Sequence, residues 1–287
     1  MKNFRAYFLL LIAVVALCSC DLAKNNKALI SEAGKALVEE LDQKDGEAGA
    51  CDVSAGAAEA DDKLVMQTSP KGTPEQILER TGYVASYNKT TLLPNWVAWH
   101  LTAERTEGSA KRSGVDFAED TEVPEPRATD WDYYNSGYDR GHMCPAADNK
   151  WSKKAMEESF LFTNMCPQNG NLNRGDWNEM EMACRKWAKK YGDLYIVCGP
   201  ILYKGKHKTI GKNKVVVPEA FFKVVLRTGD NPQAIGFIYK NTSGNRPKDS
   251  YVNTVDEVER ITGIDFFPSL PDNVEKNVEA TADIANW

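Results

Sequence analysis

The sequence has 287 residues, a formal net charge of −6 and 42% hydrophobic residues. This length allows one large domain or two small ones, and the composition is that of a soluble protein apart from one N-terminal segment. Residues 21–62 hold eleven acidic residues and four lysines, so the rest of the chain is nearly neutral. The overall acidity therefore does not exclude a polyanionic substrate, which needs only a local basic cleft.

Residues 1–19 are typical of a lipoprotein signal peptide. Two basic residues precede an unbroken apolar run, residues 8–17, which is too short to span a bilayer as a mature helix. Residues 17–20 (LCSC) resemble a bacterial lipobox, which implies cleavage before Cys20 and lipidation of that residue. The expected location is therefore the bacterial cell envelope, periplasmic or at the outer surface, with a lipid anchor in the membrane. An ordinary signal peptide with complete release is the alternative.

Residues 20–78 are predicted to be a flexible acidic spacer that begins at the lipidated cysteine. The segment is rich in Ala, Glu, Asp, Lys and Gly and has no sustained apolar period. A short helix over residues 31–41 is compatible with the pattern, and a small helical domain is the alternative, but too little apolar surface is available to bury. The folded domain is expected over residues 79–287.

Strands and helices then alternate without a regular βαβ pattern, which favours an α+β fold. Runs of aromatic and β-branched residues between turn formers predict strands at 82–88, 95–102, 193–198, 215–228 and 233–241. Apolar periods near 3.6 predict helices at 154–162, 176–191 and 255–262. The polar, proline-containing residues 109–129 are expected to form a long loop.

Five cysteines would remain after signal cleavage and lipidation: Cys51, Cys144, Cys166, Cys184 and Cys198. An odd number in an export compartment allows at most two intramolecular disulfides, and the pairing does not follow from the sequence. The two Cys-Pro pairs lack the spacing of a zinc knuckle.

The segment YDRGHMCPAADNK contains one of only three histidines in the chain, His142. A lone histidine is more often structural than catalytic, but here its neighbours carry chemistry. Arg140 provides a positive charge, Asp139 is a candidate to orient the imidazole, and Gly141 allows close approach of the backbone. A neutral imidazole can act as a general base near neutral pH.

A second cluster lies some thirty residues later, where four residues are spaced by four: Asn173, Trp177, Glu181 and Arg185. On an α-helix this spacing forms one slowly drifting stripe, because each step turns the side chain only about 40°. A solvated face with a Glu181–Arg185 ion pair explains the spacing equally well. The tryptophan slightly favours a functional cleft.

Together, DRGH and Asn-x-x-x-Trp-x-x-x-Glu resemble the DNA/RNA non-specific endonucleases of the Serratia nuclease and mitochondrial endonuclease G type. Further segments have counterparts in the same order, including LPNWVAWHLT, TNMCPQ, IVCGPILY and VPEAFFKVVL. The resemblance covers about residues 81–280 and implies a ββα-metal nuclease fold, with a mixed or antiparallel sheet flanked by helices.

The resemblance also implies roles for single residues. His142 corresponds to the general base, and Asn173 to the only protein ligand of a catalytic Mg²⁺, for which Mn²⁺ is expected to substitute. Glu181 corresponds to the carboxylate that holds water of the metal shell and assists proton transfer. Arg140 matches an arginine that contacts phosphate and contributes to catalysis.

Four other positions follow from the same alignment. Arg185 matches a second phosphate-binding arginine, and Arg112 in GSAKRSG matches a catalytic, phosphate-binding arginine of the preceding loop. Asn164 and Trp177 match residues that support the cleft. Nothing evidently reads base edges, and phosphate contacts carry no sequence information, so both DNA and RNA are the expected substrates.

Two alternatives to this endonuclease remain: a catalytically degenerate nucleic-acid-binding lipoprotein, and a phosphodiesterase acting on another substrate. Both predicted catalytic positions, His142 and Asn173, are present, which disfavours the degenerate protein. A zinc protease or zinc deaminase is disfavoured as well, because neither HExxH nor a His/Cys-x-x-Cys constellation occurs.

Overall fold

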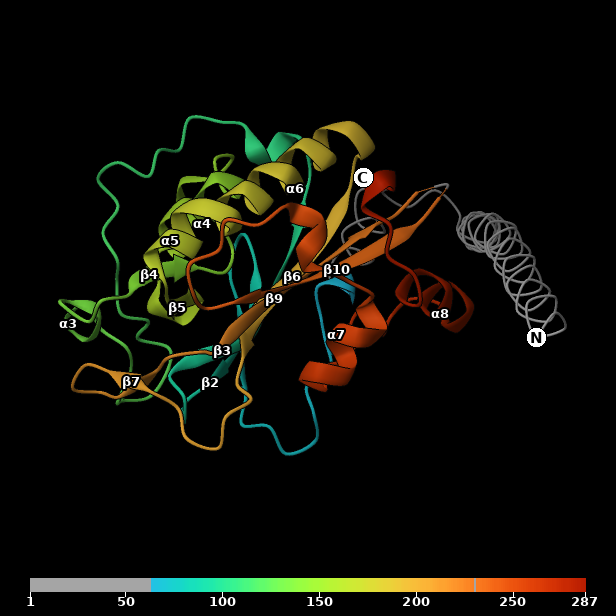
Figure 1. Ribbon diagram of the computed structural model, residues 1–287. Helices are drawn as coiled ribbons and strands as arrows, with labels where there is room; N and C mark the ends of the chain where they lie inside the picture. Colours follow the sequence, from blue (N-terminus) through green and yellow to red (C-terminus); the bar gives the residue numbers. More distant parts are fainter. Residues whose placement is uncertain (1–62, 230) are drawn as a thin grey trace, which may run out of the picture.

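The computed structural model describes residues 63–229 and 231–287, and its centre is a seven-stranded antiparallel sheet (Figure 1). The order across the sheet is β1-β2-β3-β6-β9-β10-β11. The strands are β1 Gln76–Glu79, β2 Val84–Asn88, β3 Leu93–Leu101, β6 Leu194–Ile201, β9 Ala220–Arg227, β10 Gln233–Lys240 and β11 Val252–Asn253. The predicted strand at 215–228 is divided, because Pro218 lies between β8 (Val215–Val216) and β9 and cannot donate a ladder hydrogen bond.

The sheet begins before residue 79, the predicted start of the folded domain. Strand β1 pairs with β2 over its whole length, and Thr68 forms an isolated bridge with Asp265. The side chain of Gln67 accepts a hydrogen bond from the backbone of Phe267 at 2.8 Å. Residues 63–78 therefore belong to the fold rather than to the spacer.

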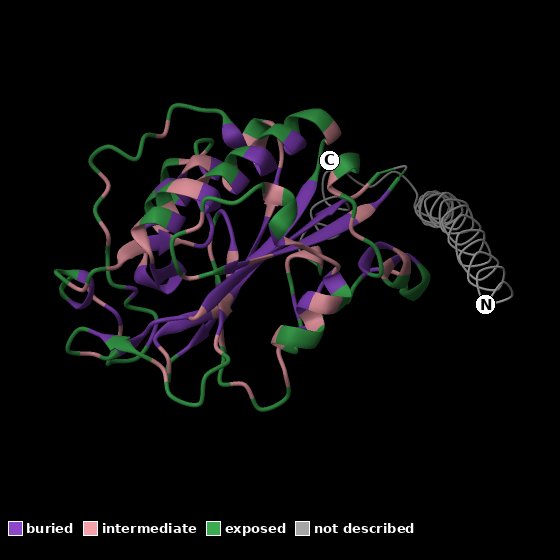
Figure 2. Ribbon diagram, viewed as in Figure 1, coloured by how far each residue is buried: buried purple, intermediate pink, exposed green. Residues whose placement is uncertain are grey.

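Helices cover both faces of the sheet, and its central strands are buried (Figures 1 and 2). Helices α7 (Val255–Thr262) and α8 (Asp272–Glu279) cover one face. On β9, the alternation of side chains turns Phe222 and Val224 toward these helices and Phe221 and Val225 toward the opposite face. Lys223 also lies on that opposite face, although it is fully buried.

The face opposite α7 and α8 carries a separate two-stranded ribbon followed by a long helix. Strand β4 (Asp139–His142) pairs antiparallel with β5 (Met165–Gln168). The short helix α5 (Gly170–Leu172) leads through a π-helical turn, Asn173–Trp177, into helix α6 (Asn178–Tyr191). This β-β-α unit brings the DRGH segment, which forms β4, against the start of α6.

The remaining elements are short. Helices α3 (Asp130–Tyr133) and α4 (Lys153–Glu158) flank the ribbon, and β7 (Thr209–Ile210) pairs with β8 in a hairpin. The 3-10 turns are Glu104–Thr106, Ala146–Asp148, Phe162–Asn164, Lys248–Tyr251 and Ile284–Asn286. Residues 109–129 form a loop beside the ribbon, as predicted, except for an isolated bridge between Ala118 and Leu161.

Candidate active site

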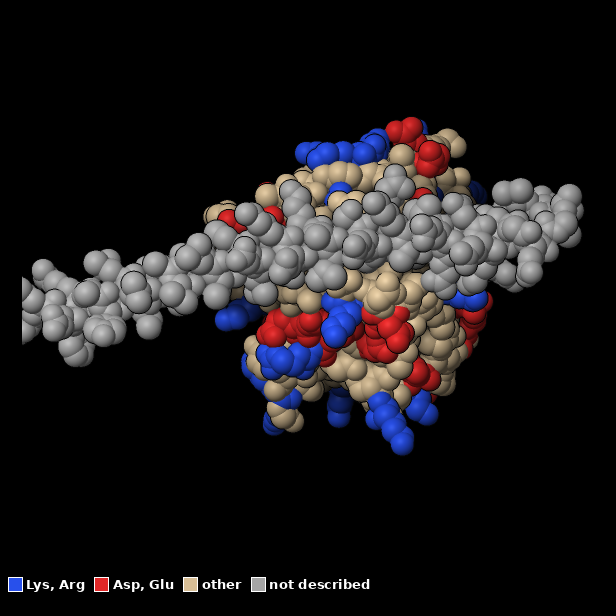
Figure 3. All heavy atoms as spheres, turned by 90° about the vertical axis from the view of Figure 1, so that its right-hand side faces the viewer, with Lys and Arg blue, Asp and Glu red and all other residues tan. Residues whose placement is uncertain are grey.

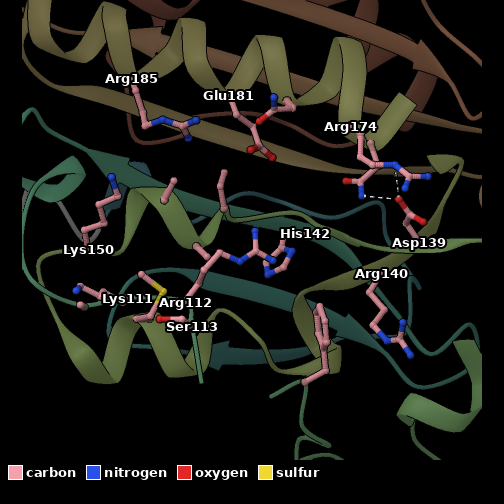
Figure 4. Close-up of a pocket in the computed structure, with 18 of the residues that line it drawn as sticks. Lys111, Arg112, Ser113, Asp139, Arg140, His142, Lys150, Arg174, Glu181 and Arg185 are labelled. Atoms are coloured by element: carbon pink, nitrogen blue, oxygen red, sulfur yellow. Dashed lines mark hydrogen bonds and ion pairs between the residues drawn. The ribbon is translucent and has the colours of Figure 1, made fainter. Parts of the chain in front are cut away.

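A cleft of about 890 Å³ opens between strand β4, helix α6 and the loop before α3. Two acidic side chains, Asp139 and Glu181, line it together with six basic ones (Figure 4). The six are Lys111, Arg112, Arg140, Lys150, Arg174 and Arg185. A concave site with this excess of positive charge focuses the field that attracts an anionic ligand.

His142 lies at the centre of the cleft wall, at the end of β4, with Arg112 beside it (Figure 4). Its ring packs edge-on against Phe160 at 4.9 Å between centroids, and Phe117 lies at 5.7 Å. The Nε2 atom is enclosed and has no hydrogen-bond partner among the described residues. Burial and, second, the charge of Arg112 lower the pKa of His142 to about 3, so the imidazole is neutral at pH 7.

Two buried side chains from other elements fix the backbone around this histidine. Trp177 donates from Nε1 to the carbonyl oxygen of His142 at 3.3 Å. Asn164 accepts from the backbone N–H of Cys144 at 2.8 Å and donates to the carbonyl oxygens of Cys144 and Ser159 at 2.9 and 2.8 Å. Asn164 and Trp177 do not line the cleft; they hold the strand that carries His142 from beneath.

Gly141 is required by the packing between the two strands of the ribbon. A Cβ at this position would lie 2.4 Å from Oε1 and 2.6 Å from Cβ of Gln168 on β5, which is well inside van der Waals contact. The close approach predicted for this glycine is thus to a buried glutamine of the neighbouring segment.

Asn173 lies at the start of the π-helical turn and faces Asp139. Its Nδ2 donates to Asp139 Oδ2 at 3.1 Å, and Arg174 Nε lies 3.4 Å from the same carboxylate oxygen (Figure 4). Asp139 therefore orients the asparagine, whereas the sequence had suggested it as a partner for the imidazole of His142. With its Nδ2 occupied, Asn173 has its amide oxygen available as a ligand atom.

The expected helical stripe is interrupted at Gly175, whose φ of −101° and ψ of −113° lie outside the helical range. This kink changes the direction of the side chains before α6, because the helical path is broken at Gly175. As a result Trp177 is buried against Phe221 and Tyr239, while Asn173 and Glu181 line the cleft. The prediction of a single continuous face is wrong for this reason.

Glu181 projects from the first turn of α6 into the cleft. Burial raises its pKa to about 7, and the nearby Lys223 opposes this shift. The ammonium group of Lys223 is fully buried and lies 4.3 Å from the ring of Trp177 and 5.0 Å from that of Trp99. A cation beneath the cleft floor thus favours the ionised form of Glu181.

The three predicted arginines line the cleft in different settings. Arg140 donates to Asp130 at 2.6 Å and extends away from His142 (Figure 4). Arg185 pairs with the buried Asp148 at 2.8 Å and so forms no i,i+4 pair with Glu181. Arg112 lies 5.7 Å from the ring centroid of Phe160 and has no carboxylate partner within the described residues.

Three contributors to the site were not predicted from the sequence. Asp148 and Lys223 are buried ionic groups behind α6, and Asp148 also accepts from Trp99 Nε1 at 3.1 Å. A lysine inside the apolar run AFFKVVL was the available signal for Lys223. Lys150 lines the cleft from the segment just after the 3-10 turn that contains Asp148, and its proximity could not be read from spacing.

The four described cysteines are free and buried, which answers the question that the sequence left open for them. Cys144 accepts from Asn149 Nδ2 at 3.3 Å, and Cys198 contacts the carbonyl oxygen of Met143 at 3.3 Å. Burial raises the pKa of the Cys184 thiol to about 12 and that of Cys198 to about 11, so both are protonated at neutral pH.

The donor set of the cleft suits a hard cation. The amide oxygen of Asn173 and the carboxylate of Glu181 are oxygen ligands, and Mg²⁺ prefers few protein oxygens together with water. No thiolate or second imidazole lines the cleft within the described residues, which argues against a zinc site there.

Several predictions concern residues outside the described part of the chain: the signal peptide, the lipidation of Cys20, most of the acidic spacer, and the state of Cys51. Among residues 63–229 and 231–287, no helix has the length and apolar character needed to cross a bilayer.

Several known nucleases are similar in sequence to this chain. Nuclease EXOG, mitochondrial, of Danio rerio is 38% identical over 69% of this chain and 64% of its own length. Endonuclease G, mitochondrial, of Homo sapiens is 34% identical over 68% of this chain and 70% of its own. Nuclease C1 of Cunninghamella echinulata var. echinulata is 36% identical over 72% of this chain and 88% of its own. The chain thus spans less than two thirds of the Danio rerio relative.

These relatives overturn one prediction. The N-terminal sequence predicted a lipoprotein of a bacterial cell envelope, whereas the EXOG and Endonuclease G relatives are mitochondrial nucleases. The predicted location is therefore wrong. A short apolar run ending in cysteine is weak evidence for a cellular location when relatives of the folded domain belong to another compartment.

The fold agrees with the same assignment. A solved structure of the EndoG/EndoGI complex matches with a TM-score of 0.65 and 32% identity, over 69% of this chain and 87% of the other. The predicted α+β, ββα-metal nuclease fold is thereby confirmed. The family model for DNA/RNA non-specific endonucleases matches residues 61–273. The chain belongs to the DNA/RNA non-specific endonuclease family, as its two motifs predicted.

Proposed function

We propose that the protein is a Mg²⁺-dependent endonuclease that hydrolyses phosphodiester bonds of DNA and RNA with little sequence preference. The observation that carries this proposal is the convergence of a neutral imidazole, an oriented amide oxygen and six cations in one cleft. Residues 63–287 would supply the whole catalytic unit.

His142 is proposed to accept the proton of the attacking water. Its low pKa keeps the ring neutral and ready to accept a proton, although it also makes the free ring a weak base. Burial is the larger cause of this low pKa and the charge of Arg112 the smaller one; a substrate phosphate beside Arg112 would offset the smaller cause and so strengthen the base. Arg112 would thus couple the arrival of the substrate to proton transfer.

The arginines are proposed to bind phosphate oxygens. Arg112 has no carboxylate competitor, so we assign it the direct contact; Arg140 and Arg185 add positive charge while held by Asp130 and Asp148. Contacts of this kind recognise the backbone and not the bases, and they use no feature of the 2′-hydroxyl. Both DNA and RNA are therefore suitable substrates.

Asn173 would hold the Mg²⁺ through its amide oxygen, and Glu181 would orient water of the metal shell. A bound Mg²⁺ supplies charge stabilisation for the phosphoryl oxygens and for the leaving 3′ oxygen. Asp139 keeps the Asn173 amide turned with its oxygen free, and Lys223 favours the carboxylate form of Glu181.

The test is a plasmid-nicking and RNA-cleavage assay of purified protein with Mg²⁺, with Mn²⁺ and with EDTA. Wild-type protein is expected to cleave both nucleic acids and to stop in EDTA. His142→Ala is expected to lose at least about a hundredfold in rate, the usual minimum for a missing general base.

A matched control is His207→Ala, because that histidine pairs with Glu219 at 3.0 Å and does not line the cleft. It should cleave at the wild-type rate. Normal cleavage by His142→Ala protein with an intact melting transition would refute the assigned base. Tight binding of DNA without cleavage by the wild type would instead indicate the degenerate binding protein.

A further inference from the structure

Three carboxylates from the two helices on the far face of the sheet converge away from the cleft. Asp256 and Glu259 lie one turn apart on α7, and Glu279 is the last residue of α8. One oxygen from each lies within 4.8 Å of the others. The two helices pack against each other on the sheet face opposite α6 (Figure 1).

Glu279 is unusual among these residues. Its side chain is buried, with 4% of the residue exposed, and its Oε1 has no hydrogen-bond partner among the described residues. It also ends α8, where the negative end of the helix dipole disfavours a carboxylate. A buried, unpartnered carboxylate at a helix C-terminus requires a compensating positive group or a proton.

The neighbouring charges make the site more negative. Asp265 and Glu275 act on Glu279 through their charge, as do the two α7 carboxylates. Within the described residues, no lysine, arginine or histidine forms an ion pair with any member of the cluster. The arginine of α7, Arg260, is paired with Glu257 at 2.7 Å. Burial and this mutual repulsion raise the pKa of Glu279 to about 9.

We propose that Asp256, Glu259 and Glu279 bind one Ca²⁺ ion that joins α7 to α8. The ligands are hard oxygens, as this cation requires. Ca²⁺ accepts about six to eight oxygens in a flexible geometry, so carboxylates from two separate helices suit it, whereas Mg²⁺ demands a near-ideal octahedron. Glu259 accepts the backbone N–H of Phe266 at 2.8 Å through Oε1, which holds its carboxylate in place. Waters complete the coordination.

The ion would stabilise the fold without taking part in cleavage. It lies on the face of the sheet opposite the cleft and ties the C-terminal helix to α7. The side of the molecule seen in Figure 3 carries acidic and basic side chains next to one another. This site is separate from the Mg²⁺ position proposed at Asn173.

The test is calorimetric titration of EDTA-treated, dialysed protein with CaCl₂, together with melting temperatures with and without Ca²⁺. The wild type is expected to bind one Ca²⁺ at this site and to melt at a higher temperature in its presence. Glu279→Gln and Asp256→Asn should each weaken binding at least tenfold and remove the Ca²⁺-dependent rise in melting temperature. Asp256 is exposed, so its variant remains informative if the buried one fails to fold.

Two controls separate this site from the cleft. Glu257→Gln, on the same helix but paired with Arg260, should bind Ca²⁺ like the wild type. Asn173→Ala should keep the Ca²⁺-dependent stabilisation, and Glu279→Gln should keep Mg²⁺-dependent cleavage. Absence of Ca²⁺ binding in the wild type, or an unchanged response in both carboxylate variants, would overturn the proposal and leave protonation of Glu279 as the explanation.

Discussion

Replacing Asn164 by alanine is expected to destabilise the protein and to slow cleavage, although this residue does not touch the cleft. Its amide is fully buried and makes three hydrogen bonds to the backbone, two of them to Cys144. Alanine leaves one buried N–H and two carbonyl oxygens without these partners. Cys144 is two residues after His142, so the loss acts on the position of the imidazole.

The expected loss of stability follows from the three backbone groups that lose their hydrogen-bond partner. An unsatisfied buried donor or acceptor costs about 1–3 kcal/mol, and a carbonyl oxygen costs less than an N–H because its second lone pair remains available. We therefore expect Asn164→Ala to lower the free energy of unfolding by about 3–5 kcal/mol. A domain stability of about 5–15 kcal/mol would leave the variant folded but marginal.

The assay is urea unfolding followed by tryptophan fluorescence, with nicking rates measured well below the lowered melting temperature. Asn273→Ala, an exposed asparagine on α8, is the control and should change stability by less than about 0.5 kcal/mol. A loss below about 1 kcal/mol for Asn164→Ala would refute the hydrogen-bond argument. Reduced stability with a wild-type rate would show that these bonds support the fold but do not position His142.

Three further predictions concern the cleft. Because Glu181 has a pKa of about 7, the rate of cleavage should rise with pH through that value. The free energy of unfolding should fall as pH rises from about 4.5 to 7, since the carboxyl binds its proton more tightly in the folded than in the unfolded state. A rate already maximal at pH 5 would contradict the role of this carboxylate. Gly141→Ala should lower the melting temperature and the rate, because the added methyl group overlaps Gln168; a rate within twofold of wild type would count against this packing. Arg185→Met should cost about 3–5 kcal/mol by leaving Asp148 buried without its partner, and a second change, Asp148→Asn, should recover much of it in urea unfolding.

Much of the sheet could be predicted because its strands are runs of apolar residues between turn formers. Helix α7 matches the predicted limits, 255–262, because Thr254 caps its start and Gly263 ends it. The strand character of DRGH could not be predicted, because its conformation depends on pairing with a segment more than twenty residues later. Local pattern carries no information about such a partner.

The candidate site was predictable in its residue types but not in its arrangement. Spacing by four suggested one helical stripe, and a π-helical turn instead places Trp177 under His142 and Asn173 beside Asp139. The effect of the buried Lys223 on Glu181 depends on which face of β9 its side chain lies on and on the packing of that face beneath the cleft, neither of which a linear motif contains. The site therefore depends on long-range contacts that a linear motif does not contain.

The kinked turn Asn173–Trp177 has a consequence for the changes in length that this chain can tolerate. Each residue added to or removed from a helix rotates everything on one side of it by about 100° and shifts it by about 1.5 Å. A substitution within 173–177 alters one side chain, but a one-residue deletion would turn Asn173 away from Asp139 while leaving α6 in place. We therefore expect a one-residue deletion here to disturb the site as much as replacement of the asparagine would.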